Sequence, residues 1–304
     1  MLSRKKLLSF IARYKKVHLT ARRHLQAGSQ MYKTSVGIIE AALIGHGSSV
    51  LISHGSGGGY DMGLWLAQLF GGQFQYVAPS RFGYLRSPSP SNPAPEAQAD
   101  VYAALLDTLD INSVIIIGLS AGGPSALQFA LRHSRRCRGL IMLSAASRAV
   151  PPLPAVLQAI YPFMLKSDFI PWLLYAIAPQ VVFRANGISR ALLTRIKLER
   201  EKMRLLDTLF QTTFPTTPRR EGMINDLQQL TVFQTYPIEH ITVPTLVVHA
   251  VNDPIIPIEL GEYTAHTIPG AHFLKLEEGG HFACITHREE INPIVQEFLN
   301  RHGD

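Results

Sequence analysis

Short apolar runs alternate along the chain with segments in which apolar residues recur every three or four positions. The runs predict strands at residues 36–44, 48–53, 75–78, 113–117, 137–144, 244–250 and 271–276. The periodic segments predict helices at residues 62–70, 95–109, 123–133 and 288–301. Strands that alternate with helices are typical of an α/β protein, so the pattern predicts a mostly parallel sheet flanked by helices.

Two segments depart from this alternation. The strands 36–44 and 48–53 are separated only by Gly45-His46-Gly47, which predicts a hairpin of adjacent strands. Residues 147–235 contain several prolines, apolar helical patches and a charged run, and no strand-like run of any length. We therefore expect a helical cap (lid) at 147–235, inserted into a core made of residues 36–146 and 236–304.

The charge of the chain is concentrated at its N-terminus. The net charge is +7 over 304 residues, and residues 1–39 hold nine of the 29 Lys and Arg residues but no acid. The remainder is nearly balanced, with 20 basic against 22 acidic residues. A basic substrate groove through the fold is not supported. Nucleic-acid binding is not expected either, because no recognised nucleic-acid-binding fold accompanies the charge.

Residues 1–35 are predicted to form a basic amphipathic arm. Its apolar residues recur at spacings of three and four, at Leu7, Phe10, Tyr14, Val17 and Ala21. The arm lacks the long apolar core of a signal peptide. We expect this helix to pack on its own domain. The alternative is that it lies on an anionic membrane surface as a peripheral contact.

Cysteines and glycines exclude several classes of protein. Cys137 and Cys284 are too few for a disulfide scaffold and lie among apolar residues, so we expect reduced core thiols in a cytoplasmic protein. The glycines of residues 55–59 lack the lysine of a phosphate-binding loop and match no dinucleotide-binding pattern. No cofactor and no metal is expected.

The segment Gly118-Leu119-Ser120-Ala121-Gly122 lies between the strand 113–117 and the helix 123–133. A G-x-S-x-G there is the pattern of a nucleophile elbow, in which the serine occupies a strained turn with its hydroxyl above the sheet. A serine hydroxyl needs a base within hydrogen-bond reach and an acid that orients the base. In the elbow architecture the acid and then the base follow the serine along the chain.

Asp253 and His281 meet that order. Each lies just past the carboxyl end of a predicted strand, where α/β sheets carry their chemistry. His281 lies in a glycine-flanked turn that lets it project into a site. The competing histidines are His249, His272 and His287. The alternative for Asp253 is an Asx turn before Pro254.

Acyl transfer also needs donors for the developing oxyanion. One is the backbone N–H of the residue after the nucleophile, Ala121, and the other comes from a loop after an earlier strand. The loop that begins at His54 is that segment, with the Ser56 N–H as the expected donor and the Gly57 N–H as the alternative.

These motifs together resemble the α/β-hydrolase fold with a helical cap, over residues 36–304. The elbow serine implies a serine hydrolase, since dehalogenases and epoxide hydrolases of this fold use aspartate there. Family members commonly carry D-x-x-G-x-G-x-S after the third strand, whereas Ser80 replaces the aspartate here and Leu85 the second glycine.

We expect Ser120, His281 and Asp253 to cleave the acyl bond of a small to medium apolar substrate, a carboxylic ester first. Thioester, amide and carbon–carbon bond hydrolysis on the same fold stay open. A non-catalytic ligand-binding protein is the remaining alternative, and the oligomeric state has no signature in the sequence.

Overall fold

The computed structural model describes residues 4–152, 155–232 and 235–303. At its centre is an eight-stranded sheet with the strand order β1-β2-β4-β3-β5-β6-β7-β8. The strands are β1 (Gln30–Thr34), β2 (Gly37–Ile44), β3 (Ser48–Ser53), β4 (Phe74–Pro79), β5 (Val114–Leu119), β6 (Cys137–Leu143), β7 (Thr245–Ala250) and β8 (His272–Leu276). The pairs β1–β2 and β2–β4 are antiparallel and the other pairs are parallel, which confirms the predicted fold class.

The predicted hairpin of residues 36–44 and 48–53 is wrong. β2 and β3 do not pair, because β4 lies between them and bonds to both. β2 instead forms a hairpin with β1, a strand that the sequence analysis assigned to the arm. The turn from β2 to β3 passes closely over the start of β4: a Cβ on Gly45 would lie 2.2 Å from the Phe74 carbonyl oxygen. The glycines therefore allow a crossing over β4.

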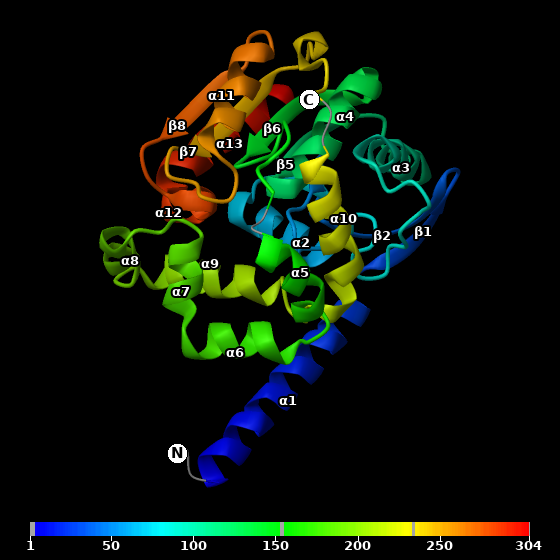
Figure 1. Ribbon diagram of the computed structural model, residues 1–304. Helices are drawn as coiled ribbons and strands as arrows, with labels where there is room; N and C mark the ends of the chain where they lie inside the picture. Colours follow the sequence, from blue (N-terminus) through cyan, green and yellow to red (C-terminus); the bar gives the residue numbers. More distant parts are fainter. Residues whose placement is uncertain (1–3, 153–154, 233–234, 304) are drawn as a thin grey trace.

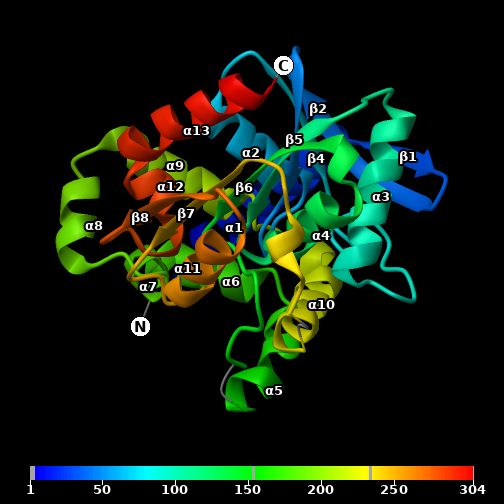
Figure 2. The ribbon, with the colours of Figure 1, turned by 90° about the horizontal axis from the view of Figure 1, so that it is seen from above.

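Helices cover both faces of the sheet (Figures 1 and 2). One face carries α2 (Tyr60–Phe70) and α13 (Arg288–His302), and the other carries α3 (Pro95–Thr108), α4 (Gly123–Arg132) and α11 (Ile258–Thr267). Side chains of successive residues in a central strand point to opposite faces of the sheet. Ile115 and Ile117 pack in the core under α2 and α13, and Ile116 packs in the core under α3 and α4. Continuous burial on both sides explains why these strands are apolar throughout.

Between β6 and β7 the described residues form helices joined by loops and contain no strand. It contains α5 (Ala155–Met164), α6 (Phe169–Ile177), α7 (Pro179–Ala185), α8 (Arg190–Ile196), α9 (Arg200–Gln211), the turn η3 (Thr217–Arg219) and α10 (Arg220–Thr231). Several of these helices gather on one side of the sheet in Figure 1. We call the segment from α5 to α10 the cap. Residues 153–154 and 233–234 of the predicted cap, and residues 1–3 of the predicted arm, lie outside the described residues.

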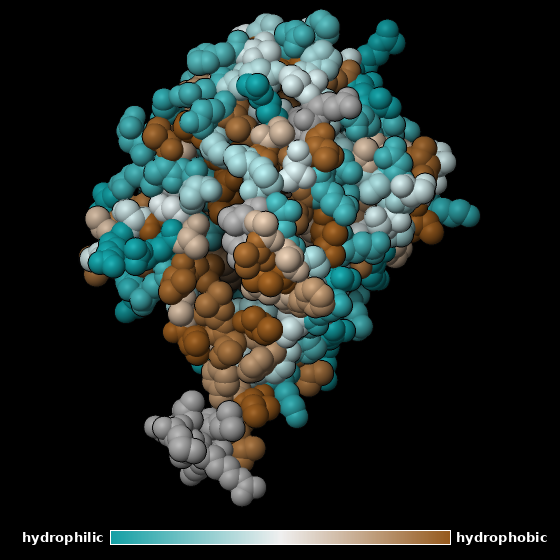
Figure 3. All heavy atoms as spheres, in the orientation of Figure 1, coloured by the Kyte–Doolittle hydropathy of each residue, from teal (hydrophilic) through white to brown (hydrophobic). Residues whose placement is uncertain are grey.

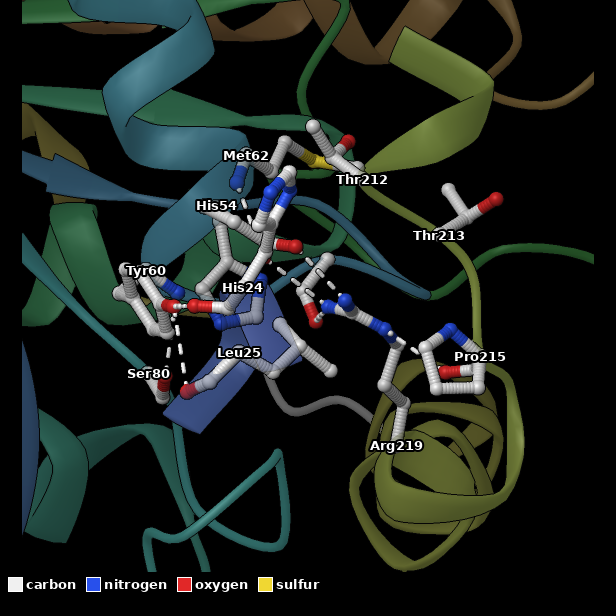
Figure 4. Close-up of polar contacts among 12 residues, drawn as sticks. His24, Leu25, His54, Tyr60, Met62, Ser80, Thr212, Thr213, Pro215 and Arg219 are labelled. Carbon is white, nitrogen blue, oxygen red and sulfur yellow. Dashed lines mark hydrogen bonds and ion pairs between the residues drawn. The ribbon is translucent and has the colours of Figure 1, made fainter. Parts of the chain in front are cut away.

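The arm forms one long helix, α1 (Arg4–Ala27), which packs on the cap. The Phe10 ring lies 4.8 Å from Trp172 and the Tyr14 ring 5.1 Å from Phe169, between centroids. At the end of α1, the Tyr60 hydroxyl donates to the carbonyl oxygens of His24 and Leu25 (Figure 4). The helix thus contacts the body of the protein along its half-buried side. The side chain of Leu7 lies outside the described residues.

Candidate active site

Ser120 occupies a strained turn at the end of β5. Its φ is +51°, in the left-handed region that non-glycine residues seldom adopt. The turn is possible because its neighbours have no side chain in the way: a Cβ on Gly122 would lie 2.1 Å from the Ser53 carbonyl oxygen. A Cβ on Gly118 would lie 2.8 Å from the Cβ of Ala126 in α4. The turn η1 (Ser120–Gly122) then leads directly into α4.

His281 lies beside this serine, in the short turn η5 (Gly280–Phe282) after β8. Its Nε2 is 2.9 Å from the Ser120 Oγ, although 161 positions separate the two residues. Its Nδ1 is 2.8 Å from Oδ2 of Asp253. In the tautomer that satisfies both bonds, Nδ1–H donates to the carboxylate and Nε2 accepts the serine proton. The three side chains can thus transfer a proton from the hydroxyl to the imidazole.

Asp253 is held by a second set of contacts. Its Oδ1 accepts the amides of Ile255 at 2.8 Å and Ile256 at 3.0 Å, which is the Asx turn expected as the alternative role. Burial alone raises the pKa of Asp253, but hydrogen bonding to His249, His281 and the Ile256 amide outweighs it and holds the pKa well below its usual range. The carboxylate is therefore ionised at neutral pH.

The three competing histidines lie elsewhere. His249 is fully buried behind Asp253, and its Nε2 is 2.9 Å from the Ile256 carbonyl oxygen and 3.5 Å from Asp253 Oδ2. It therefore donates chiefly to the carbonyl while facing the carboxylate. His287 contacts the Thr286 hydroxyl at 2.9 Å, and the side chain of His272 is exposed on the edge strand β8. No bond from these two residues to Ser120 or Asp253 is found among the described residues.

The loop after β3 lies against Ser120, as a Cβ on Gly55 would be 3.2 Å from the Ser120 Cβ. His54 shapes this loop: its Nδ1–H donates to Gly55 O at 2.7 Å, and its Nε2 accepts the Arg81 amide at 2.9 Å. Burial and the Arg81 charge hold the pKa of His54 well below its usual range, so the ring is neutral. The Gly57 N–H donates to the Tyr84 hydroxyl at 3.3 Å. The amide of Gly57 therefore already has a protein partner.

The cap contacts the loops that carry Asp253 and His281. The Asn252 side-chain NH₂ donates to Gly187 O at 3.0 Å, and its Oδ1 accepts the Gly280 amide at 2.9 Å. The His281 amide donates to Asn186 O at 2.8 Å. These bonds join the loop before Asp253, the turn of His281 and the segment after α7.

The bond from His281 to the cap is a backbone contact, so it does not depend on the side chain at position 186. The bonds of Asn252, in contrast, use both ends of its side-chain amide. Asn252 was not among the predicted site residues, although it stands beside Asp253 in the sequence.

Two buried arginines join the cap to the core near the glycine-rich loop. Arg219 of η3 is fully buried, and its guanidinium donates to Gly58 O at 2.6 Å and to Asp61 Oδ2 at 2.7 Å (Figure 4). Arg81 forms a two-pronged pair with Asp226 of α10, at 2.7 and 2.6 Å. The first pair bonds the glycine-rich loop directly, and the second joins α10 to the segment after β4.

Tyr84 connects the pair of Arg81 and Asp226 to the loop. Burial and the Asp226 carboxylate raise the pKa of Tyr84, so its hydroxyl keeps the proton and donates to Asp226 Oδ2 at 2.5 Å. The hydroxyl oxygen of Tyr84 also accepts the Gly57 amide. Sequence reasoning missed this link, because Arg81 and Asp226 are 145 positions apart.

The two departures from the family pattern have a structural explanation. Leu85 has φ +55° at the position where the family commonly has glycine, so the backbone keeps the conformation that glycine favours. Ser80 donates to Oε2 of the fully buried Glu40 at 2.8 Å, and Arg86 donates to Oε1 of Glu40 at 2.7 Å. Glu40 of β2 therefore supplies a carboxylate where position 80 has none.

A small polar cavity adjoins the elbow. Its volume is about 20 Å³, which is room for about one water molecule. It is lined by Ala121 and by three residues with a buried polar atom that has no protein partner, namely Arg81 (Nε), Gln98 (Nε2) and Asn225 (Oδ1).

The sequence profile of the alpha/beta hydrolase fold family matches residues 49–288, which is more than half of the chain. The chain belongs to the alpha/beta hydrolase fold family. This α/β-hydrolase is 27% identical over 259 residues to 2-hydroxymuconate semialdehyde hydrolase of Pseudomonas putida, covering 84% of this chain and 88% of that protein.

Solved structures agree with the family. The α/β-hydrolase superposes on an alpha/beta hydrolase fold protein from Nakamurella multipartita with a TM-score of 0.78, at 27% identity, over 91% of this chain and 99% of that one. A thermophilic esterase from Thermogutta terrifontis gives a TM-score of 0.71 at 22% identity, over 91% of this chain and all of that one, a likeness of fold alone. The protein is an enzyme of the hydrolase class.

Proposed function

We propose that this α/β-hydrolase cleaves the carboxylic ester bond of a small to medium apolar substrate through an acyl-enzyme on Ser120. The observation that carries the proposal is the continuous hydrogen-bonded chain from Ser120 through His281 to Asp253, at 2.9 and 2.8 Å. A set of side chains in this order activates a serine hydroxyl.

As the Ser120 Oγ attacks the ester carbonyl, His281 takes the hydroxyl proton. Asp253 stabilises the imidazolium that forms. The amides of Ala121 and Ser56 hold the oxyanion, a choice favoured over Gly57 because the Gly57 amide is bonded to Tyr84. His281 then protonates the departing alcohol. Water activated by the same imidazole attacks the acyl-enzyme and releases the acid.

An aromatic cluster beside the base favours an apolar acyl group. Phe282 follows His281 directly, and its ring lies 5.8 Å from Phe210 of α9. Phe210 in turn stacks on Tyr175 of α6 at 4.5 Å. These rings link η5 to the cap and place apolar groups next to His281.

A carbon–carbon bond hydrolase is the second candidate. It is favoured by the similarity to 2-hydroxymuconate semialdehyde hydrolase and by Arg81 and Asn225 beside Ala121. We rank it second because the charge of Arg81 is already paired with Asp226. A complete Ser–His–Asp set argues against a non-catalytic ligand-binding protein.

The proposal is tested by labelling with a fluorophosphonate probe, followed by hydrolysis of p-nitrophenyl esters of increasing acyl length. We expect wild-type protein to label and the Ser120→Ala variant not to label. An unlabelled wild type, beside a labelled reference serine hydrolase, would contradict the enzymatic role of Ser120. Labelling of Ser120→Ala would instead show that another residue is the nucleophile.

A further inference from the structure

An extended apolar surface covers the outer side of the cap. Figure 3 shows apolar residues gathered over α5, α6 and α7. Seven large apolar side chains of these helices are between 43% and 73% exposed: Val156, Ile160, Phe163, Ile170, Leu174, Ile177 and Val181. We call these seven residues the apolar cap face. Exposed apolar patches of this kind mark interaction surfaces.

The exposure follows from the sequence of the helices. In α6 the residues Ile170, Leu174 and Ile177 have the spacing of one helical stripe and are exposed, while Trp172 is buried. In α5 the residues Val156, Ile160 and Phe163 repeat the same spacing. A helix that faces water normally carries polar residues on its outer stripe. Both helices carry apolar ones instead.

The segment of chain that carries this face is poor in acids, although the exposed Asp207 of α9 accepts the hydroxyl of Tyr175 in α6. Residues 149–189 contain a single acid, Asp168, and it is buried against His18 at 2.8 Å. Lys166 and Arg184 are exposed in the same segment. The described part of the cap between α5 and α7 thus combines an apolar face with basic groups and has no exposed acid.

The helix α1 adds more positive charge to the same body. It contains no acidic residue, and its side chains Arg13, Lys15 and Lys16 are exposed. Phe10 and Tyr14 hold it against Trp172 of α6, which carries part of the apolar cap face. The basic helix and the apolar face are therefore attached to one another.

We propose that the apolar cap face, flanked by the basic residues of α1, docks this enzyme on an anionic lipid bilayer. Apolar side chains next to Lys and Arg complement the acyl boundary and the headgroups of such a membrane. Among the described residues, no helix is long and apolar enough to cross a membrane. The contact is interfacial, with the cap providing the insertion and α1 the electrostatic attraction.

Sedimentation with vesicles tests this docking, using phosphatidylcholine mixed with phosphatidylglycerol and phosphatidylcholine alone. We expect wild type to sediment with the mixed vesicles only. The triple variant Phe163→Gln, Ile177→Gln, Val181→Gln should bind at least about tenfold more weakly. The affinity of the variant Arg13→Gln, Lys15→Gln, Lys16→Gln for the mixed vesicles should fall about fivefold per charge removed. Added salt should likewise lower the affinity of wild type.

The matched control is Val36→Gln, Ile38→Gln, Leu198→Gln, since these side chains are 60%, 48% and 84% exposed and lie outside the apolar cap face. It should bind as wild type does. The rate of p-nitrophenyl acetate hydrolysis should be the same in wild type and in all these variants. This assay therefore reports a failure of the proposed esterase activity independently of vesicle binding. The docking is overturned if wild type does not sediment with anionic vesicles or if the cap variant binds equally well. It is also overturned if the face only mediates self-association, seen as a change of mass in sedimentation velocity.

Discussion

Oδ2 of Asp253 lies 2.8 Å from Nδ1 of His281, while Oδ1 of the same carboxylate accepts the amides of Ile255 and Ile256. One oxygen faces His281 and the other closes an Asx turn. The two roles that the sequence offered for Asp253 are thus compatible, because each uses its own oxygen.

Replacing Asp253 by asparagine separates the two roles. Asn keeps an oxygen for the turn, but its NH₂ cannot accept the Nδ1–H of His281, so the imidazole loses its correct tautomer. We expect kcat for p-nitrophenyl butyrate to fall by about 10⁴. Circular dichroism should show an unchanged fold. Activity within about tenfold of wild type would exclude Asp253 as the orienting acid.

The low pKa of Asp253 also makes stability depend on pH. Its folded pKa lies below the value of about 4 that the unfolded chain has, so the carboxylate stabilises the fold above about pH 4 and this contribution is lost as the pH falls further. The difference in free energy of unfolding between wild type and Asp253→Asn should therefore be constant near neutral pH and shrink in acid. Urea unfolding at a series of pH values measures it. A difference that does not change with pH would contradict the stabilised carboxylate.

The pair of Arg81 and Asp226 should be costly to break from one side. The variant Asp226→Leu leaves a buried guanidinium without its carboxylate, and we expect a loss of about 3–5 kcal/mol in free energy of unfolding. The double variant Arg81→Met, Asp226→Leu should lose less than Asp226→Leu alone, because no buried charge is left unpaired. Urea unfolding of both variants tests this order. The reverse order would show that the pair stabilises the fold as an ion pair.

A carboxylate at position 80 should partly replace the carboxylate of Glu40. Removing the buried carboxylate in Glu40→Ala leaves Ser80 and Arg86 without their acceptor, at a cost of about 1–3 kcal/mol in free energy of unfolding. Adding Ser80→Asp should recover part of that loss by placing a carboxylate just after the adjacent strand β4. Thermal unfolding of the single and double variants measures the recovery. If Ser80→Asp destabilises Glu40→Ala further, the two positions do not share one role.

Local pattern was sufficient for most of the elements and for the order of the site residues. The helix α3 begins at Pro95 as expected, and Ser120 lies on a turn that its flanking glycines make possible. These features depend on residues close together in the chain, where periodicity, proline and glycine act directly. The strand β1 was not predicted, because its residues, Gln30–Thr34, alternate in exposure on a sheet edge and form no apolar run.

Motifs and their order along the chain were enough to predict the type of the fold, the strained turn at Ser120 and the order of Ser120, Asp253 and His281. The three-dimensional arrangement was needed to show that β4 separates β2 from β3, that Glu40 supplies a carboxylate near position 80, and that Arg219 bonds the cap to the glycine-rich loop. Each of these depends on hydrogen bonds between residues distant in the chain. Such bonds leave no periodic pattern in the sequence. Each donor or acceptor could pair with many residues of the chain, and the fold decides which of those residues lies within reach.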